Sequence, residues 1–252
     1  MKVVLAFPFR DDAEFTRSPG FKVVKDQVSQ LTRFSSVITV DSGHQPFNRA
    51  ATRNLAVRRA EELEADVVVL CDADSIPQRD PLREAILAAA DSGLIHYPFN
   101  EVWEMAPKAI HLIRVGRTVN QLRNRSFHRY GPSQGGIWVC RPETWWKAGG
   151  QEERLVGWGC EDRAMIAAAN TMVGKAVHHE GVLMCLYHHR PPTDQQWMPD
   201  DVELLRRYEN SIGNLSEMRA ILDERPYDFS PLTRPSKVGE KARTSFPGDL
   251  YR

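Results

Sequence analysis

The chain has 252 residues, its 33 Lys and Arg are balanced by 33 Asp and Glu, and 42% of it is hydrophobic. This length buries a substantial core and fits one large α/β domain with a small appendage. The zero net charge excludes a global field that would draw the protein to nucleic acid or to an anionic membrane, although it allows local basic patches.

Sequence signals of localisation favour a soluble, cytoplasmic protein. The apolar run at the N-terminus stops at Pro8 and Arg10, too short for a signal peptide, and no segment has the apolar length of a transmembrane helix. The four cysteines form no C-x-x-C pair, so the sequence gives no support for a zinc ribbon or a redox motif. Their apolar surroundings suit reduced, buried thiols. They are Cys71, Cys140, Cys160 and Cys185. By analogy, a short chain without a predicted membrane segment resembles bacterial or phage enzymes.

The first hundred residues alternate between strand and helix patterns. Apolar and β-branched runs predict strands at 2–7, 36–40, 67–71 and 94–98, and longer patterns predict helices at 21–34, 47–64 and 81–91, with a turn at 76–79. This alternation predicts an α/β fold with a mostly parallel central sheet flanked by helices. In such sheets ligands bind beyond the carboxyl ends of the strands.

The pattern is less regular after residue 100. Residues 101–128 are mixed and partly helical, with arginines at 114, 117, 123, 125 and 129 that could flank an anionic ligand or form a solvated face. We expect a loop at 131–136, a strand at 137–141, helices at 142–147 and 161–172, and one or two strands at 178–188. The resulting division is a domain at 1–190 with halves at 1–100 and 101–190, a charged, surface-lying helical extension at 191–224, and a proline-rich tail or arm at 225–252.

Two carboxylates, Asp72 and Asp74, follow the apolar run VVVLC. Because alternate side chains of a strand share a face, we expect both to project from the strand end, where a divalent metal would bridge them. Unpaired aspartates this close repel each other unless a cation or a proton compensates. The pattern predicts a metal site, although paired aspartates after a strand also serve as turn and helix-cap residues.

A second motif lies far downstream, at residues 135–162, GGIWVCRPETWWKAGGQEERLVGWGCED. It combines a Gly-Gly strand, a short aromatic helix, a Gly-Gly turn, a Glu-Arg pair and Gly-Trp-Gly-x-Glu-Asp. This order resembles the acceptor-side motif of family-2-like GT-A glycosyltransferases, especially the β-1,4-galactosyltransferase, chondroitin-polymerase-like and polypeptide N-acetylgalactosaminyltransferase groups. Such enzymes also carry Asp-x-Asp, an arginine-asparagine pair and a late histidine, which match Asp72-Ala73-Asp74, Arg53-Asn54 and His188.

The resemblance implies a GT-A fold and a metal-dependent, hexosyltransferase-like enzyme that moves a sugar from a nucleotide-diphosphate sugar, with UDP favoured, to an acceptor hydroxyl. Mn²⁺ or Mg²⁺ on the pyrophosphate would stabilise the leaving group's charge. By the resemblance, Asp74 contacts the metal, and Asp72 binds the donor ribose or the metal's water shell. His188 is the third expected ligand, because an imidazole beside hard oxygens suits Mn²⁺.

The catalytic base is assigned by position in the Glu161-Asp162 pair. An inverting transfer needs a carboxylate on the face opposite the leaving group, and we assign this role to Asp162. The pair begins a predicted helix, whose N–H groups favour an ionised carboxylate. On the acceptor side, Glu161 is expected to hold a hydroxyl and Trp158 to offer a sugar an apolar platform, next to Gly135 and Gly136.

The donor side rests on three predicted segments. The first strand ends where such folds hold the base and ribose, and the second ends at a carboxylate that often contacts uracil. Arg49 and Arg53 lie one helical turn apart, so both are expected at the diphosphate. The expected donor-binding residues are Pro8, Phe9, Arg10, Asp41, Arg49, Arg53, Asn54, Asp72 and Ala73.

Several alternatives remain open. Retention of configuration is one, although related retaining enzymes replace the final aspartate of the pair with asparagine. A sugar-phosphate nucleotidyltransferase is a second, although it usually has a glycine-rich, lysine-bearing loop where this chain reads FPFRDD. A non-catalytic nucleotide-sugar or glycan binder is a third. The sequence does not identify the acceptor, which could be a glycan, a protein, a lipid-linked glycan or a nucleobase. It does not identify the oligomeric state either.

Overall fold

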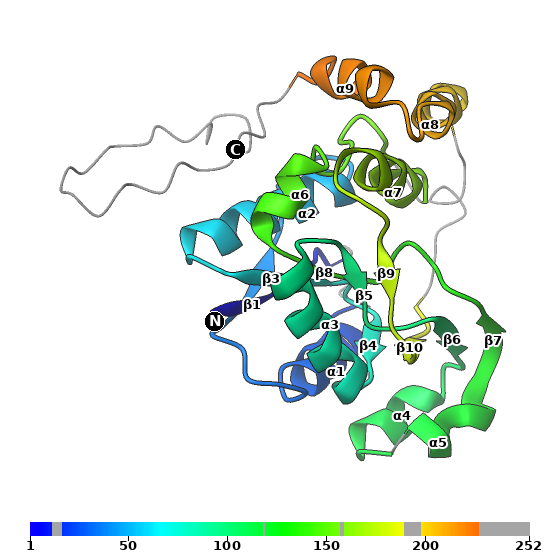
Figure 1. Cartoon of the computed structure of the whole chain (residues 1–252). Helices are drawn as coiled ribbons and strands as arrows, with labels where there is room; N and C mark the ends of the chain where they lie inside the picture. The colour runs from blue at the N-terminus through cyan, green and yellow to red at the C-terminus, as the bar shows by residue number, and fades with distance from the viewer. Residues whose placement is uncertain (12–16, 118, 157–158, 189–197, 227–252) are drawn as a thin grey trace.

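The computed structural model of the chain describes residues 1–11, 17–117, 119–156, 159–188 and 198–226. The larger of its two sheets has six strands, all in the same direction except β8 (Figure 1). Across the sheet they are β2 (Ser36–Val40), β1 (Val3–Pro8), β3 (Val67–Cys71), β8 (Ile137–Cys140), β5 (His96–Tyr97) and β9 (Val177–His178). The predicted α/β class and mostly parallel central sheet are confirmed.

Strands β1 and β3 bury every residue. Since successive side chains of a strand point to opposite faces, this means that both faces of the sheet are covered. Helix α2 (Arg49–Glu62) packs against β1, β2 and β3, and α3 (Arg79–Ser92) packs against β3, β5 and β8. Helix α1 (Ser18–Val28) ends earlier than predicted and contacts β4.

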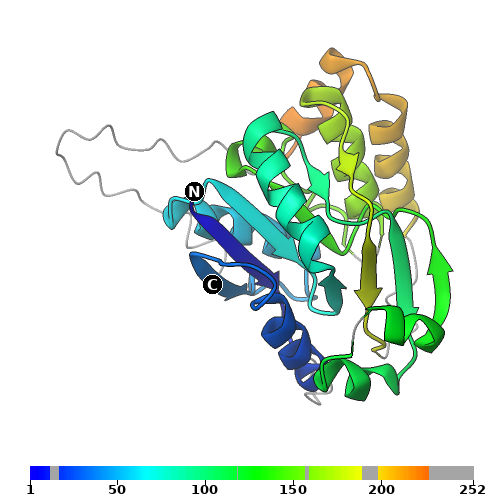
Figure 2. The same ribbon diagram turned by 60° about the horizontal axis from the view of Figure 1, so that its bottom comes forward.

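A second sheet of four strands lies beside the first (Figures 1 and 2). Its order is β4 (Ser75–Pro77), β10 (Val182–Cys185), β6 (Glu101–Met105) and β7 (Ser126–Tyr130). The predicted turn at 76–79 is wrong, because β4 pairs antiparallel with β10. The segment predicted as partly helical holds β6 and most of β7 as well as α4 (Ala109–Arg114), α5 (Val119–Leu122) and the 3₁₀ helix η1 (Arg123–Arg125).

The C-terminal helices pack on the domain and share a core with it. After α6 (Pro142–Lys147) come α7 (Cys160–Met172), α8 (Pro199–Asn210) and α9 (Leu215–Asp223), close to their predicted positions. A second hydrophobic cluster joins the last three helices through side chains that include Ala164, Leu205, Tyr208 and Ile221. One side of this extension is therefore apolar and buried, and its charged residues lie on the other side.

Arg225, the first residue of the predicted tail, is 8% exposed, and residues 227–252 of that tail lie outside the described residues. Its guanidinium donates to Glu152 at 3.2 Å, to the hydroxyl of Tyr208 at 2.6 Å and to the carbonyl of Gly149. Burial raises the pKa of Glu152, but hydrogen bonds from Arg154 and the charge of Arg225 outweigh burial and lower it below its ordinary value. Arg225 thus ties the end of the helical extension to the loop after α6.

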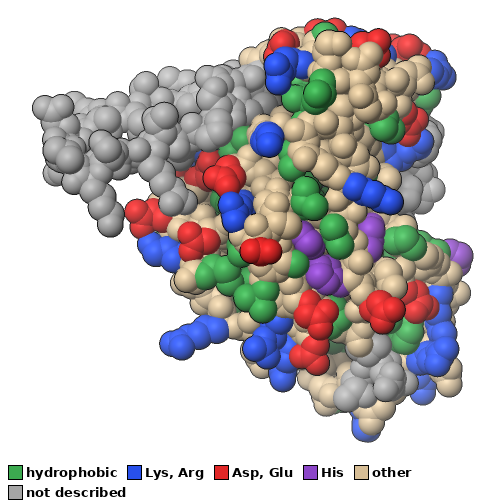
Figure 3. Space-filling view, viewed as in Figure 1, with side chains coloured by type: hydrophobic (Ala, Val, Ile, Leu, Met, Phe, Trp, Pro, Cys, Tyr) green, Lys and Arg blue, Asp and Glu red, His purple; other side chains and the backbone are tan. Residues whose placement is uncertain are grey.

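Basic and acidic side chains are interspersed over much of the face shown in Figure 3, as expected for a chain without net charge. Within the described residues, no helix has both the length and the apolar character needed to cross a membrane.

We predict that Arg225→Ala lowers the free energy of unfolding by about 1.5–3 kcal/mol, because it removes charged hydrogen bonds to the buried Glu152 while Arg154 still pairs with that carboxylate. Urea unfolding measures this loss. The matched control is Arg219→Ala on the exposed face of α9, with an expected change below about 0.5 kcal/mol. Equal losses for the two variants would show that Arg225 contributes no specific stabilisation.

Candidate active site

A single buried arginine organises the site. Arg53, 1% exposed on α2, donates through Nε and Nη2 to both oxygens of Asp72, at 2.8–3.3 Å. Its Nη1 donates to Asp162 at 2.7 Å and to Gln151 at 3.0 Å. The ring of Trp138 lies 4.2 Å from the guanidinium carbon. All five N–H donors of Arg53 are therefore engaged within the protein.

The carboxylates around Arg53 keep it charged. Burial alone would lower the pKa of Arg53, but Asp162, Asp72 and Glu161 raise it above its ordinary value. The sequence predicts a diphosphate contact for Arg53, and this prediction is wrong for the arrangement seen here, because no donor is left for a ligand. Arg53 instead bridges Asp72, which was predicted to bind the donor, and Asp162, which was predicted to be the catalytic base.

Asn54 is also part of the framework and not of the donor surface. It is 2% exposed, its amide donates to Gln151 O and to Glu153 at 2.9 Å, and its oxygen accepts from Trp145 at 2.9 Å. These contacts attach α2 to the loop after α6. Burial also raises the pKa of Glu153 to about 7. The predicted donor contact of Asn54 is corrected accordingly, because its polar atoms are already bonded.

Asp162 is held through one carboxylate oxygen only. Its Oδ1 accepts from Arg53 and, at 3.1 Å, from Gln151. Its Oδ2 lies against the α-carbon of Gly135, where the Cβ of any other residue would clash with it. Within the part of the chain that the structure describes, Oδ2 has no hydrogen-bond donor. Gly135 and Asp162, separate in the sequence motif, therefore lie side by side.

The ionisation of Asp162 differs from its prediction. Burial is the largest of the effects that together raise the pKa of Asp162 to about 7; the charge of Arg53 opposes it, and the charge of Glu161 adds to it. The expectation that the helix N-terminus keeps this carboxylate fully ionised is therefore wrong. A carboxylate that titrates near neutral pH is well matched to accept a proton from a hydroxyl.

Glu161 faces inward. Its side chain is 3% exposed; one oxygen accepts from the backbone N–H of Gly159 at 2.8 Å, and the other lies 3.7 Å from Nε of Arg49. Gly159 has φ of +94°, a conformation that favours glycine, and it turns the chain into α7. Because it is buried, Glu161 is not presented to an acceptor, contrary to the prediction from its position.

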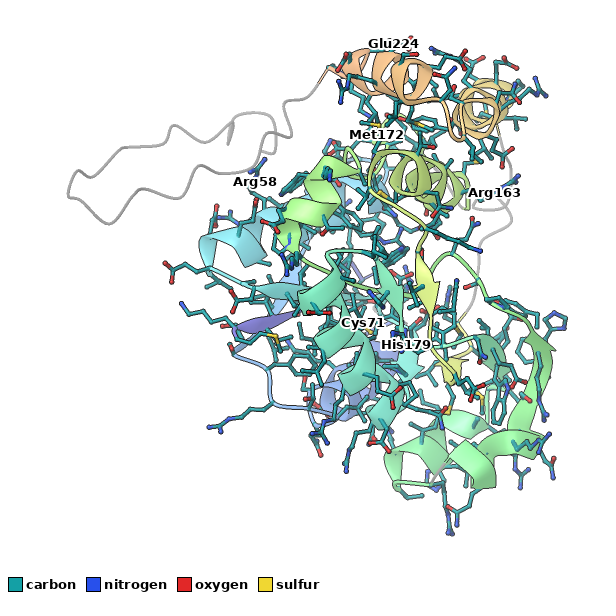
Figure 4. All side chains as sticks on the ribbon, in the orientation of Figure 1. Arg58, Cys71, Arg163, Met172, His179 and Glu224 are labelled. Atoms are coloured by element: carbon teal, nitrogen blue, oxygen red, sulfur yellow. The ribbon has the colours of Figure 1, made fainter. Side chains whose placement is uncertain are left out.

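Asp74 and His188 come together from two chain segments. Cys71, labelled at the centre of Figure 4, ends β3, so the Asp72–Asp74 motif lies in the following turn and not in the strand. Asp74 Oδ2 is 3.2 Å from His188 Nε2, and Ser75 donates to Oδ1 at 3.0 Å. Burial raises the pKa of Asp74, but the hydrogen bonds from His188 and Ser75 lower it below its ordinary value.

The donor set at Asp74 fits part of a metal site. A carboxylate and an imidazole that meet while each is about one quarter exposed are suitable ligands for Mn²⁺. Asp72 does not join them, because both of its oxygens accept from Arg53. Over the described ranges, no three His, Cys, Asp or Glu side chains form a group that could hold a metal. The three-residue ligand set predicted from the sequence is thus reduced to two.

The expected base-binding edge contains an ion pair. Arg10 donates to both oxygens of Asp41, at 2.6 and 2.7 Å. Burial raises the pKa of Asp41, but the hydrogen bonds from Arg10 outweigh it and lower the pKa. Pro8 is buried in β1, and the ring of Phe9 stacks on Phe21 with 4.0 Å between ring centroids.

Four further residues were predicted to belong to the site: Arg49, Ala73, Gly136 and Trp158. Arg49 is 25% exposed and Ala73 is half-buried, both near the carboxylates, whereas Trp158 lies outside the described residues. Gly136 has φ of +92°, and a Cβ there would lie 2.5 Å from Leu183. The sequence reasoning missed Gln151 and Trp138, both contacts of Arg53. The only signal for Gln151 is its place after the Gly-Gly turn.

No protein-family model matches this chain, and no curated protein sequence matches it significantly. Among solved structures, GalNAc-T7 with UDP, GalNAc and Mn²⁺ matches with a TM-score of 0.52 and 12% identity, over 88% of this chain and 54% of that chain. The chain has a GT-A fold. Staphylococcus aureus TarS with UDP-GlcNAc (TM-score 0.49, 13% identity, 88% and 70% covered) and Drosophila β1,4-galactosyltransferase 7 with xylobiose (0.44, 20%, 82% and 80%) are less similar in structure to this GT-A chain.

We predict that Asp162→Asn stabilises the protein at pH 8 more than at pH 5. The pKa of Asp162 is about 7 in the folded state and about 3.9 in the unfolded chain. The folded state therefore holds the proton more tightly, and the wild type loses this stabilisation as pH rises through 7. The asparagine variant does not. Melting temperatures of both proteins from pH 5 to 8 measure the difference.

The matched control is Asp91→Asn, at the exposed end of α3, for which we expect little change. If Asp162→Asn were less stable than wild type at pH 8, the ion pair with Arg53 would outweigh the cost of burying the charge.

Proposed function

We propose that this protein is an inverting glycosyltransferase that moves a sugar from a nucleotide-diphosphate sugar, with UDP as the nucleotide, to an acceptor hydroxyl. The observation that carries the proposal is the state of Asp162 in a GT-A fold: one oxygen is fixed by Arg53 and Gln151, and the other has no donor within the described chain. The pKa of Asp162, raised to about 7 by burial, suits proton acceptance at neutral pH.

In the proposed reaction, Oδ2 of Asp162 takes the proton of the acceptor hydroxyl as the hydroxyl oxygen bonds to the anomeric carbon. The bond from that carbon to the diphosphate breaks, and the nucleoside diphosphate leaves. Gly135 leaves room beside Oδ2 because it has no side chain. Arg53 and Gln151 fix the direction of the carboxylate, which lowers the cost of aligning it during reaction.

The donor is assigned to the edge formed by Arg10, Asp41 and Arg49. Asp41, 38% exposed and paired with Arg10, is assigned to a uracil ring. Arg49, 25% exposed at the start of α2, is assigned to the diphosphate. Asp74 and His188 would hold a divalent cation, which supplies charge stabilisation to the leaving diphosphate when bound. The GalNAc-T7 structure with UDP and Mn²⁺ supports the same donor chemistry by its shared fold.

We predict that UDP binds in the presence of Mn²⁺ and that Asp74→Ala lowers this affinity by more than about tenfold. The reason is that Asp74 and His188 are the two metal-ligand side chains that meet at the site. Isothermal titration with UDP and Mn²⁺, with and without EDTA, measures the effect. Asp91→Ala, remote on α3, is the control with an expected change below about twofold. UDP binding that neither EDTA nor Asp74→Ala weakens would contradict the metal assignment.

We predict that Asp162→Asn slows UDP release from UDP-sugars by roughly 10²–10⁴-fold, the usual contribution of a general base. UDP affinity should stay within about twofold, because Asp162 does not contact the donor edge. A panel of UDP-sugars with water or simple sugars as acceptors gives the rate, and chromatography identifies the product. Pyrophosphate formed from UTP and a sugar phosphate would instead identify a nucleotidyltransferase, and undiminished turnover of Asp162→Asn would move the base elsewhere.

A further inference from the structure

One surface of the chain is strongly basic. Residues 106–130 contain no Asp or Glu, and their Lys and Arg residues are Lys108, Arg114, Arg117, Arg123, Arg125 and Arg129. Arg114 belongs to α4, Lys108 and Arg117 lie just outside its two ends, Arg123 and Arg125 belong to η1, and Arg129 belongs to β7. Figure 3 shows blue side chains at the lower right of the molecule, where these elements lie. Because the whole chain has no net charge, the rest of it carries the opposite excess.

Four of these arginines, Arg114, Arg117, Arg123 and Arg125, are exposed, and none of them has a side-chain partner among the described residues. Arg123 and Arg125 lie on η1, directly before β7. Arg129 differs, since its guanidinium lies 4.8 Å from the ring centre of Trp103 and donates to Ser126 at 2.6 Å. Unpaired guanidinium groups at a surface bind carboxylate, sulfate or phosphate groups in a bidentate manner.

Aromatic rings accompany the charges. His128 and Tyr130 are exposed on β7, with ring centroids 5.3 Å apart. As alternate residues of a strand they point to the same face of the sheet. Exposed, flat aromatic faces offer apolar area at little cost in conformational entropy, which suits the apolar C–H face of a sugar ring.

The strand pairing in the smaller sheet shows that this surface lies near the proposed site. Ser75, Cys185, Glu104 and His128 are paired neighbours across β4, β10, β6 and β7. At about 4.8 Å per strand, His128 lies roughly 14 Å from Ser75. A Cβ on Gly136 would lie 3.3 Å from Ser75 Oγ, so the sheet face that carries His128 continues from the loop beside Asp162.

We propose that Arg123, Arg125, His128 and Tyr130, here called the basic hairpin surface, bind an anionic glycan strand that extends from the acceptor hydroxyl. The proposal rests on the proposed function and adds the class of acceptor. The rings pack on sugar faces, and the arginines pair with acidic groups along the strand. The acceptor is therefore an acidic polysaccharide and not a neutral one.

Charge distribution favours a glycan over a nucleic acid. Nucleic acids carry a phosphate at every nucleotide, and their binding proteins usually present an extended basic face. Here the basic residues of the surface are confined to residues 106–130, and the adjacent strand β6 carries Glu101 and Glu104. An acidic glycan, which has fewer charges per unit length and apolar sugar faces, matches these mixed charges and aromatic rings better than a nucleic acid does.

The test is fluorescence anisotropy of the full chain with three labelled probes: a hyaluronan decasaccharide, neutral maltodecaose and a ten-residue oligothymidylate. We expect hyaluronan to bind most tightly, and Arg123→Ala/Arg125→Ala to weaken its binding about tenfold at low salt. Tyr130→Ala should weaken it at low and high salt alike, because apolar contact is not screened. No donor or metal is added, so this result does not depend on whether sugar transfer occurs.

The matched control is Arg33→Ala/Arg219→Ala, which removes the same charge from exposed positions elsewhere and should change affinity less than about twofold. Equal losses for the two double variants would overturn the proposal by showing attraction to charge alone. Maltodecaose binding as tightly as hyaluronan would also overturn it, and tighter binding of the oligothymidylate would assign the surface to nucleic acid.

Discussion

The site depends on one buried cation shared between two carboxylates. Removing a guanidinium and its partners from water is costly, and the cost is offset only when every donor is bonded and the charges balance. Arg53 meets this condition through Asp72, Asp162 and Gln151. A lysine would keep the charge but lose the planar fork that spans these partners. The positions of α2, the turn after β3 and the start of α7 are thereby fixed relative to one another.

This arrangement separates structural from chemical roles. Arg53 and Asn54 hold the framework, while Oδ2 of Asp162 and the partly exposed pair of Asp74 and His188 are the groups that we propose for the acceptor proton and the metal. The smaller sheet connects the two regions, because β4 starts directly after Asp74 and β10 ends three residues before His188. Movement of that sheet would therefore move the proposed metal ligands with it.

Local patterns predicted the regular elements well, because one continuous apolar run or one proline dictates them. The strand at 67–71 and the helix at 142–147 match the structure at both ends. The smaller sheet was missed, since β4 has three residues and β6 reads EVWEM, with charges that resemble a surface helix. Pairing with distant strands stabilises these segments, and a local pattern does not contain that information.

The candidate site shows the same limit. The resemblance to GT-A glycosyltransferases predicted that residues near 53, 72, 135 and 162 belong to one site, and the structure brings them into contact. It did not predict that Arg53 points inward. A helical face gives the direction of a side chain but not what lies opposite, and Gln151 and Trp138 become neighbours of Arg53 only through tertiary packing.

The anchoring of Arg225 has a consequence for the order in which the protein is assembled during translation. Arg225 contacts Glu152 and Gly149, in the loop where Gln151 contacts Asn54 and Asp162. At roughly 5–20 residues per second, Arg225 is synthesised about 8–30 s after Asp72. Asp72 and Glu152 are therefore made well before the arginine that completes the contacts of that loop. A ribosome stalled before Arg225 would carry a chain in which the loop after α6 lacks this contact.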